Sequence, residues 1–225
     1  MNTVKIGHVT DDVKPEQRRR YDASGRQRAA ARTRTRVLAS ARELFAAEGY
    51  AGTTITAIAQ RAGVAADTVY ATVGAKPVLF RELVETALSG SDQVVEGRDR
   101  DYAVRMRAEP DAVAKLAIYA AAVTELQGRL APLFLVLREA ASGQAELRRL
   151  WRDITERRAR NMRHLAADLV STGAVRADLT RDEVADVIWT MNSSEYYDML
   201  VHERGWSTAR FQDWLLDAWC RLLLD

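Results

Sequence analysis

Hydroxyl and ammonium groups gather in a short stretch of the N-terminal third of the chain. Thr68 and Tyr70 carry hydroxyls suited to phosphate oxygens, and Thr72 can reach a phosphate or a base edge. The ammonium group of Lys76 can pair with a backbone phosphate. These residue types at this spacing indicate contact with a DNA duplex, provided that one small helical unit presents them together.

A helix-turn-helix is the unit that would position these groups. An apolar stripe over residues 55–62 predicts a short helix, and only residues 63–65, which include a glycine, separate it from a second helix over 66–73. Two short helices joined by so tight a turn must meet at a steep angle. Val69 and Val73 then point inward, which leaves the polar side of the second helix free to enter a major groove.

Two longer helices are expected to complete this unit. Apolar residues at three- and four-residue spacing predict a helix over about 29–48, and Gly49 supplies the residue able to end it. A further helix over about 76–89 begins with Pro77 in its first turn, where the missing N–H does no harm. Residues 28–89 therefore form the expected DNA-binding domain.

A basic segment precedes this domain. Nine Lys and Arg residues lie from Lys14 to Arg36, against only Glu16 and Asp22. Residues 1–27 lack apolar periodicity and are expected to be a disordered basic arm that seeks phosphate. A solvated tail without a DNA partner would have the same composition, so both interpretations stay open.

Bulk composition favours an all-α protein of the cytoplasm. The chain has 225 residues, 48% of them hydrophobic, with 4 prolines, and it carries a net charge of +2. Residues 1–90 hold 14 Lys and Arg against 9 Asp and Glu, whereas residues 91–225 hold 19 against 22, so the positive excess is N-terminal. The single Cys220 fits a reducing compartment, and no run approaches the roughly 18 to 20 apolar residues that span a bilayer.

The remaining residues, 90–225, are expected to form a second helical domain. Residues 90–109 are interpreted as a linker, followed by five helices at about 110–128, 131–142, 144–172, 180–204 and 207–224, each flanked by glycine or proline. Together with the N-terminal helices this gives about nine helices. No strand-like alternation occurs in the sequence.

The N-terminal domain resembles the DNA-binding domain of the TetR family. The resemblance covers about 50 residues and is carried by Gly49-Tyr50, Thr53 to Val64, Thr68-Val69-Tyr70 and Lys76 to Phe80. It implies that Thr68, Tyr70 and Lys76 contact the DNA backbone. It also implies a homodimer built through two late helices and a C-terminal cavity whose ligand releases a palindromic operator.

Two departures limit what the resemblance transfers. Where the family usually has Ser or Thr capping the second helix of the motif, this chain has Ala65, and Asp67 offsets part of the loss through the helix dipole. Where the family often has His-Phe after the tyrosine of the motif, this chain has Thr72-Val73. The base contacts therefore have to be established for this chain itself.

The candidate site residues fall into three sets. The DNA-binding set is Arg32, Arg34, Arg36, Thr54, Ala66, Asp67, Thr68, Tyr70, Ala71, Thr72 and Lys76. Polar and aromatic residues on apolar helix faces give the ligand-binding set Trp151, Asn161, His164, Trp189, Asn192, Glu195 and Tyr196. Broad apolar stripes give the dimer set Val187, Met191, Met199, Phe211, Trp214, Leu215, Ala218, Trp219 and Leu222.

These sets predict a DNA-binding regulator, most simply a repressor, that binds operator DNA as a homodimer and responds to a largely apolar small-molecule effector. No catalytic constellation, cofactor motif or metal-ligand spacing is recognisable, because the three histidines His8, His164 and His202 are scattered. An enzyme is therefore not expected, and neither is a membrane partner. The alternative is a helical dimeric ligand-binding protein that no longer binds DNA specifically.

Overall fold

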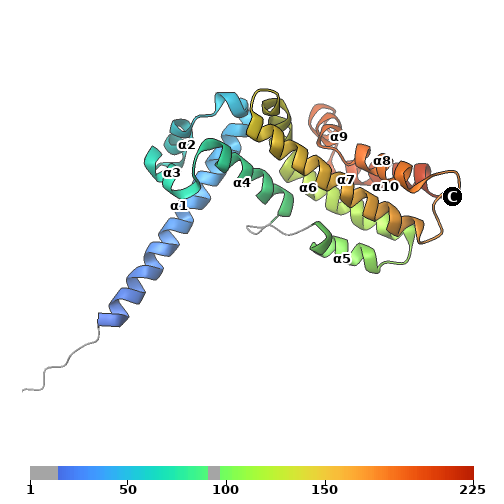
Figure 1. The fold of residues 1–225 in the computed structure, drawn as a ribbon, viewed down its shortest axis with the longest axis horizontal. Helices are drawn as coiled ribbons and strands as arrows, with labels where there is room; N and C mark the ends of the chain where they lie inside the picture. Colours follow the sequence, from blue (N-terminus) through green and yellow to red (C-terminus); the bar gives the residue numbers. More distant parts are fainter. Residues whose placement is uncertain (1–14, 91–96) are drawn as a thin grey trace, which may run out of the picture.

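The computed structural model describes residues 15–90 and 97–225, and every regular element in these ranges is helical. The N-terminal part consists of α1 (Pro15–Gly52), α2 (Ile55–Ala62), α3 (Ala66–Val73) and α4 (Lys76–Ser89). In Figure 1, α1 projects away from the body as a long rod, with α2, α3 and α4 gathered around its C-terminal half. This confirms the expected all-α fold with an N-terminal helix-turn-helix.

The C-terminal part is a bundle around two long helices. After a single 3-10 turn (Gly97–Asp99) come α5 (Asp101–Ala108), α6 (Ala112–Ala141) and α7 (Ala145–Val170). The chain then forms α8 (Arg181–Met191), α9 (Ser194–Tyr197), a π-helical turn (Asp198–Glu203) and α10 (Thr208–Leu223). The helices α6 and α7 run side by side along the length of this bundle (Figure 1).

The first helix begins earlier than the sequence pattern suggested. Residues 15–27, expected to belong to a disordered arm, continue α1 without a break, whereas residues 1–14 lie outside the described residues. Arg and Gln make up six of these 13 residues, and both have high helix propensity, so the missing apolar stripe did not mean a missing helix. The positive φ of Gly49, 68°, interrupts α1 near its expected end at residue 48, and one more turn follows.

The helix-turn-helix itself follows the local signals closely. Thr54 caps α2 by accepting a hydrogen bond from the Ala57 N–H at 3.0 Å. Gly63 ends α2 in the left-handed conformation, with a φ of 65°. Ala65 occupies the N-cap position of α3 with extended backbone and makes no side-chain hydrogen bond there, so α3 lacks a side-chain cap.

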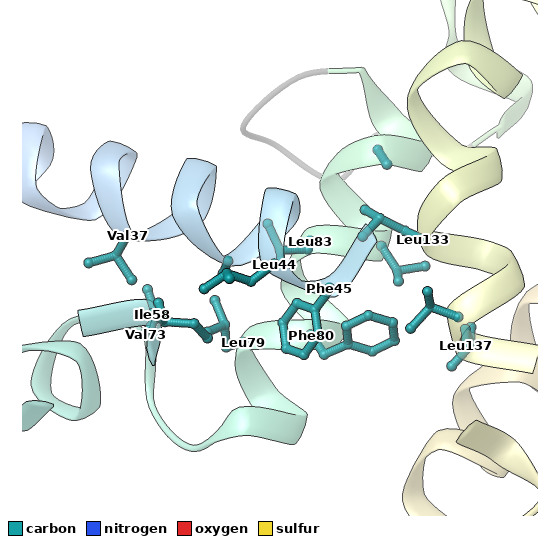
Figure 2. Close-up of a cluster of buried hydrophobic side chains, with 14 of the residues drawn as sticks. Val37, Leu44, Phe45, Ile58, Val73, Leu79, Phe80, Leu83, Leu133 and Leu137 are labelled. Carbon is teal, nitrogen blue, oxygen red and sulfur yellow. The ribbon is translucent and has the colours of Figure 1, made fainter. Parts of the chain in front are cut away.

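The core of the N-terminal part reaches into the second half of the chain. Phe45 of α1 and Phe80 of α4 meet edge to face, with ring centroids 4.7 Å apart. Leu133 and Leu137 of α6 complete this cluster, and Figure 2 shows them beside the phenylalanine pair. Leu147 of α7 belongs to the same cluster. The expected boundary near residue 90 therefore separates two segments of sequence that share one hydrophobic core.

One continuous helix replaces two expected ones. The sequence predicted helices at 110–128 and 131–142, but α6 runs unbroken through Gly128 and Pro132. The ring of Pro132 would clash with the carbonyl of the residue four positions earlier, which is Gly128. The backbone of a glycine can adjust most easily, because glycine has no side chain. Burial along most of α6 stabilises the helix on both sides of the proline, so packing overrides the local break signal.

Length and composition alone would allow α6 to span a membrane, since it has 30 residues and an 18-residue window of mean hydropathy 1.3. Its contacts with α1, α4, α5, α7, α9 and α10 instead make it the central core helix of the bundle.

The expected linker and the expected helix over 180–204 also differ from the structure. Residues 101–108 form α5, which packs on α6 through Ala103 and Met106. The helix predicted over 180–204 breaks at Asn192, where α8 ends, and Ser193 caps the short α9 by accepting from the Tyr196 N–H. Consecutive polar residues at 192–194 can bond the backbone locally, which competes with helix continuation.

Candidate DNA-binding surface and sensor cavity

The helix α3 presents a polar side to solvent and an apolar side to the core. Val69 and Val73 are buried, as the sequence indicated, whereas Tyr70 is 53% exposed. Asp67 and Ala71 are also exposed, and Ala66, Thr68 and Thr72 are half-buried at the margins of this side. The exposed side of α3 thus carries the set of groups predicted to approach DNA.

The hydroxyl of Thr72 is already engaged within α3. Its Oγ1 donates a hydrogen bond of 2.6 Å to the carbonyl oxygen of Thr68, one turn earlier. The hydroxyl proton is therefore committed to the helix, and the oxygen remains available only as an acceptor. A base amino group is a better partner for this oxygen than a phosphate, which offers no donor.

Lys76 lies at the start of α4 beside an aromatic ring of α1. Its Nζ is 4.2 Å from the centroid of Tyr50, a cation–π contact that holds the ammonium group in place. Partial burial lowers the pKa of Lys76. The side chain is half-buried, so its charge is presented from a fixed position rather than from a freely moving stem.

The three arginines near the middle of α1 are placed differently from one another. Arg34 forms an ion pair with Glu82 of α4, which fixes α1 against α4. Arg32 and Arg36 are exposed, four residues apart and hence on one side of the helix. Arg28 precedes them by another four residues and is also exposed, so a stripe of three arginines follows α1 toward its N-terminus.

A cavity of about 230 Å³ lies where the N-terminal helices meet the bundle. Glu85 and Leu88 of α4 line one wall, and the other walls come from α5, α6, α7 and the α8–α9 junction. A second cavity of about 300 Å³ adjoins it, and Tyr119 and Met162 line both. Because α4 forms part of the wall, the first cavity contacts the unit that carries α3.

The predicted pocket residues separate into two groups. Asn161 and Asn192 line the first cavity, and Asn161 and His164 line the second. The other four have structural partners and line neither cavity. Trp151 packs against the N-terminal core, Trp189 lies under the guanidinium of Arg158, Glu195 pairs with Arg138, and Tyr196 stacks on Trp214.

Buried hydrogen bonds organise the cavity wall around Gln127, which the sequence did not single out. Its Nε2 donates to the Asn192 carbonyl oxygen at 2.6 Å, and its Oε1 accepts from the Ser194 hydroxyl at 2.8 Å. The Asn192 amide in turn donates to the Tyr119 hydroxyl at 2.7 Å. Burial raises the pKa of Tyr119 far above its ordinary value, so this phenol stays neutral.

Periodicity could have indicated Gln127 and Tyr119. Both lie on the apolar side of α6, and a glutamine inside such a stripe is itself a signal of a polar contact in the core. The positions of Arg157 and Arg158 gave no such signal, because residues 157 and 158 belong to a run of charged residues that an exposed helix face would also show.

The predicted dimer residues are also split by burial. Phe211, Leu215 and Trp219 are fully buried within the chain and Met191 nearly so, which leaves them no surface for a partner. The rest retain exposed apolar surface on α8, the π-helical turn and α10: Val187, Met199, Trp214, Ala218 and Leu222.

Comparison with known proteins identifies the N-terminal unit. Residues 37–83 match the family model described as bacterial regulatory proteins, tetR family. This range includes the C-terminal part of α1, all of α2 and α3, and half of α4. A search of curated proteins found no match.

Solved structures share the fold over most of the chain. A TetR-family regulator from Mesorhizobium loti is 20% identical, covers 87% of this chain and 98% of its own, and has a TM-score of 0.63. NalD, the secondary repressor of the MexAB-OprM multidrug efflux pump in Pseudomonas aeruginosa, is 21% identical, with 85% and 96% coverage and a TM-score of 0.62.

A transcriptional regulator from Saccharomonospora viridis, solved in complex with choline, is 20% identical, with 85% and 97% coverage and a TM-score of 0.64. The chain therefore matches the tetR family model over its helix-turn-helix, residues 37–83, and shares the all-helical fold of these solved regulators over most of its length.

Proposed function

We propose that this protein is a cytoplasmic repressor that binds a palindromic operator as a homodimer and leaves it when a small molecule occupies the cavity beside α4. The observation that carries the proposal is the wall of that cavity, since Glu85 and Leu88 of α4 line it while α3 immediately precedes α4 in the chain. A ligand in this position touches the helix that must move for α3 to be displaced.

The DNA-binding part of the proposal rests on the exposed side of α3. Tyr70 and Thr68 supply hydroxyls for phosphate oxygens, and Ala71 offers a methyl group to a base. Lys76 adds a positioned charge at the start of α4. Thr54 caps α2 with its oxygen, which leaves its hydroxyl proton free for a phosphate.

The dimer part rests on apolar surface near the C-terminus. Leu222 of α10 is 46% exposed, and Ala218 and Trp214 lie one and two turns before it on the same side. An isologous pairing of this surface would place two α3 helices about a two-fold axis, as a palindromic operator requires. NalD is a repressor, which favours the same role here.

The release mechanism requires the ligand to distinguish two states of the protein. A ligand that bound both equally well would change nothing, so it must fit the cavity better when α4 is displaced than when α3 is placed for DNA. The choline of the Saccharomonospora viridis protein is a cation. The arginines in this cavity disfavour a cationic ligand, so a different effector is expected here.

A binding assay with the DNA upstream of the gene tests the first part. Tyr70→Ala and Lys76→Ala should each weaken binding by roughly tenfold, because each removes a contact worth about 1 to 2 kcal/mol. Arg163→Ala, an exposed charge change on α7, is the control and should leave binding unchanged. Equal affinity for the upstream DNA and for unrelated DNA would instead support a ligand-binding protein that no longer reads an operator.

A further inference from the structure

The first cavity is lined by an excess of positive charge. Arg100, Arg157, Arg158 and Arg160 all contribute to its wall, against Glu85 as the one acidic residue among its described lining residues. Arg157 donates to both carboxylate oxygens of Glu85, at 2.8 and 3.0 Å, so that pair is internally neutral. Arg100 has an interaction of its own and Arg160 is exposed to solvent, so Arg158 is the charge of this wall to be examined further.

Arg158 is half-buried in this wall and has an incomplete set of hydrogen-bond partners. One terminal nitrogen donates to the Trp189 carbonyl oxygen at 3.1 Å, and the guanidinium lies 4.3 Å from the Trp189 ring centroid. Its Nε is buried without a hydrogen-bond partner. Among the described residues, no carboxylate lies within ion-pair distance of Arg158. Glu195 is near enough to interact with its charge, but Glu195 forms its ion pair with Arg138.

A partly buried guanidinium without an ion-pair partner is costly to a folded protein. Burial lowers the pKa of Arg158, in keeping with the loss of water around its charge. An uncompensated buried charge destabilises the fold unless a partner restores the lost interactions, and a planar carboxylate matches the fork of an arginine. Stacking on Trp189 holds the guanidinium plane in one orientation, which prepares it for such a partner.

The rest of the cavity offers an apolar body and one more polar contact. Leu126, Leu130, Phe134 and Ile154 line it together with Arg158. The Asn192 Oδ1 atom is buried without a partner in the same wall. A molecule that fits this wall has an apolar tail along the leucines and its polar end at Arg158.

Building on the proposed sensing role, we infer that the effector is an apolar monocarboxylate whose carboxylate pairs with Arg158. Arg158 calls for one negative charge, since Arg157 already has Glu85, Arg100 has an interaction of its own and Arg160 is exposed to solvent. A carboxylate near these two arginines also competes with Glu85 for Arg157. That competition loosens the contact of α4 with α7, which links ligand binding to α3 without any further group.

Three probes with the same chain length and different head groups test the charge of the ligand: octanoate, 1-octanol and octylamine. Thermal unfolding of the full chain is followed with each probe at about 1 mM, since a ligand that binds only the native state raises the unfolding temperature. Octanoate should raise it, and the other two should raise it less. An equal shift with 1-octanol, a larger shift with octylamine, or no shift with octanoate would each overturn the inference.

Substitutions on α7 test the role of Arg158. Arg158→Gln should weaken octanoate binding by at least about tenfold in calorimetry, as expected for a lost charged hydrogen bond, while 1-octanol binding stays unchanged. Arg163→Gln, an exposed arginine that lines neither cavity, is the matched control. Arg158→Lys keeps the charge and should retain part of the binding; octanoate affinity unaltered in Arg158→Gln would overturn the assignment.

A DNA-release assay separates this inference from the proposed function. Octanoate that binds through Arg158 and also dissociates the operator complex supports both. Octanoate that binds through Arg158 but leaves operator affinity unchanged supports the ligand class and contradicts ligand-induced release.

Discussion

Glu85 of α4 and Arg157 of α7 form an ion pair in which one guanidinium nitrogen contacts both carboxylate oxygens. The two side chains are 21% and 35% exposed, so solvent screens the pair only in part. This contact joins the helix that follows α3 to the wall of the cavity. It is therefore a polar link between the proposed sensor cavity and the helix that follows α3.

A double-mutant cycle should measure this link. Glu85→Gln and Arg157→Gln should each lower the free energy of unfolding by about 1 kcal/mol, and the double variant by little more than either alone, because both remove the same pair. Urea unfolding supplies the values, with Arg163→Gln as a control for loss of an unpaired surface arginine. Additive losses would mean that the two residues act independently.

Restoring the missing cap of α3 should stabilise the protein. Ala65 is exposed and already has the extended backbone of an N-cap residue, with a φ of −72° and a ψ of 151°. In Ala65→Ser the new oxygen can accept from the Asp67 N–H, since the Thr68 N–H already donates to the Ala65 carbonyl oxygen, and this should raise the free energy of unfolding by about 1 kcal/mol. Ala71→Ser, in the exposed middle of α3, lacks a free N–H to cap and should have no stabilising effect in the same unfolding experiment.

The N-terminal part of α1 should contribute to DNA affinity through charge alone. Deleting residues 1–27 removes Lys5, Lys14 and four arginines but keeps the stripe of Arg28, Arg32 and Arg36. Each phosphate contact adds about one to the slope of log affinity against log salt, so the deletion should flatten this slope while the preference for the operator persists. An unchanged slope in fluorescence anisotropy would show that the segment does not contact DNA.

The C-terminal surface should control the oligomeric state. Leu222→Glu places a charge in the proposed interface at an exposed position, so the monomer should fold while the dimer dissociates. Sedimentation velocity measures the outcome. Val78→Glu makes the same kind of change on the exposed side of α4 and should leave the mass unaltered.

The sequence predicted α2, α3 and α4 well, unlike the start of α1, because their signals are local. Thr54, Gly63 and Pro77 mark helix ends through their own backbone chemistry, and the bounds of α2 and α3 follow from them. The same kind of signal failed at Pro132, where burial along α6 outweighs the break. Residues at the helix ends thus set the bounds of the short helices α2 and α3, whereas burial sets the extent of the long helix α6.

The cavity was harder to predict because its residues come from five separate parts of the chain. Asn161 and Asn192 were found as polar interruptions of apolar faces. Glu195 showed the same pattern but forms an ion pair with Arg138. Arg158 could not be recognised because it lies in a run of charged residues. Sequence spacing shows which side of a helix a residue occupies, but the partner across the bundle is set only by the fold.

The shared core around Phe45, Phe80, Leu133 and Leu137 determines how this protein can be engineered. A fragment ending after α4 would expose the face that α6 covers, so it is a poor module for transfer to another sensor. A chimera made from this chain needs its junction after α7, or a foreign α6 whose residues refill the same space. Exchange of domains with relatives is therefore limited by α6, because this helix packs against both the N-terminal helices and the C-terminal bundle.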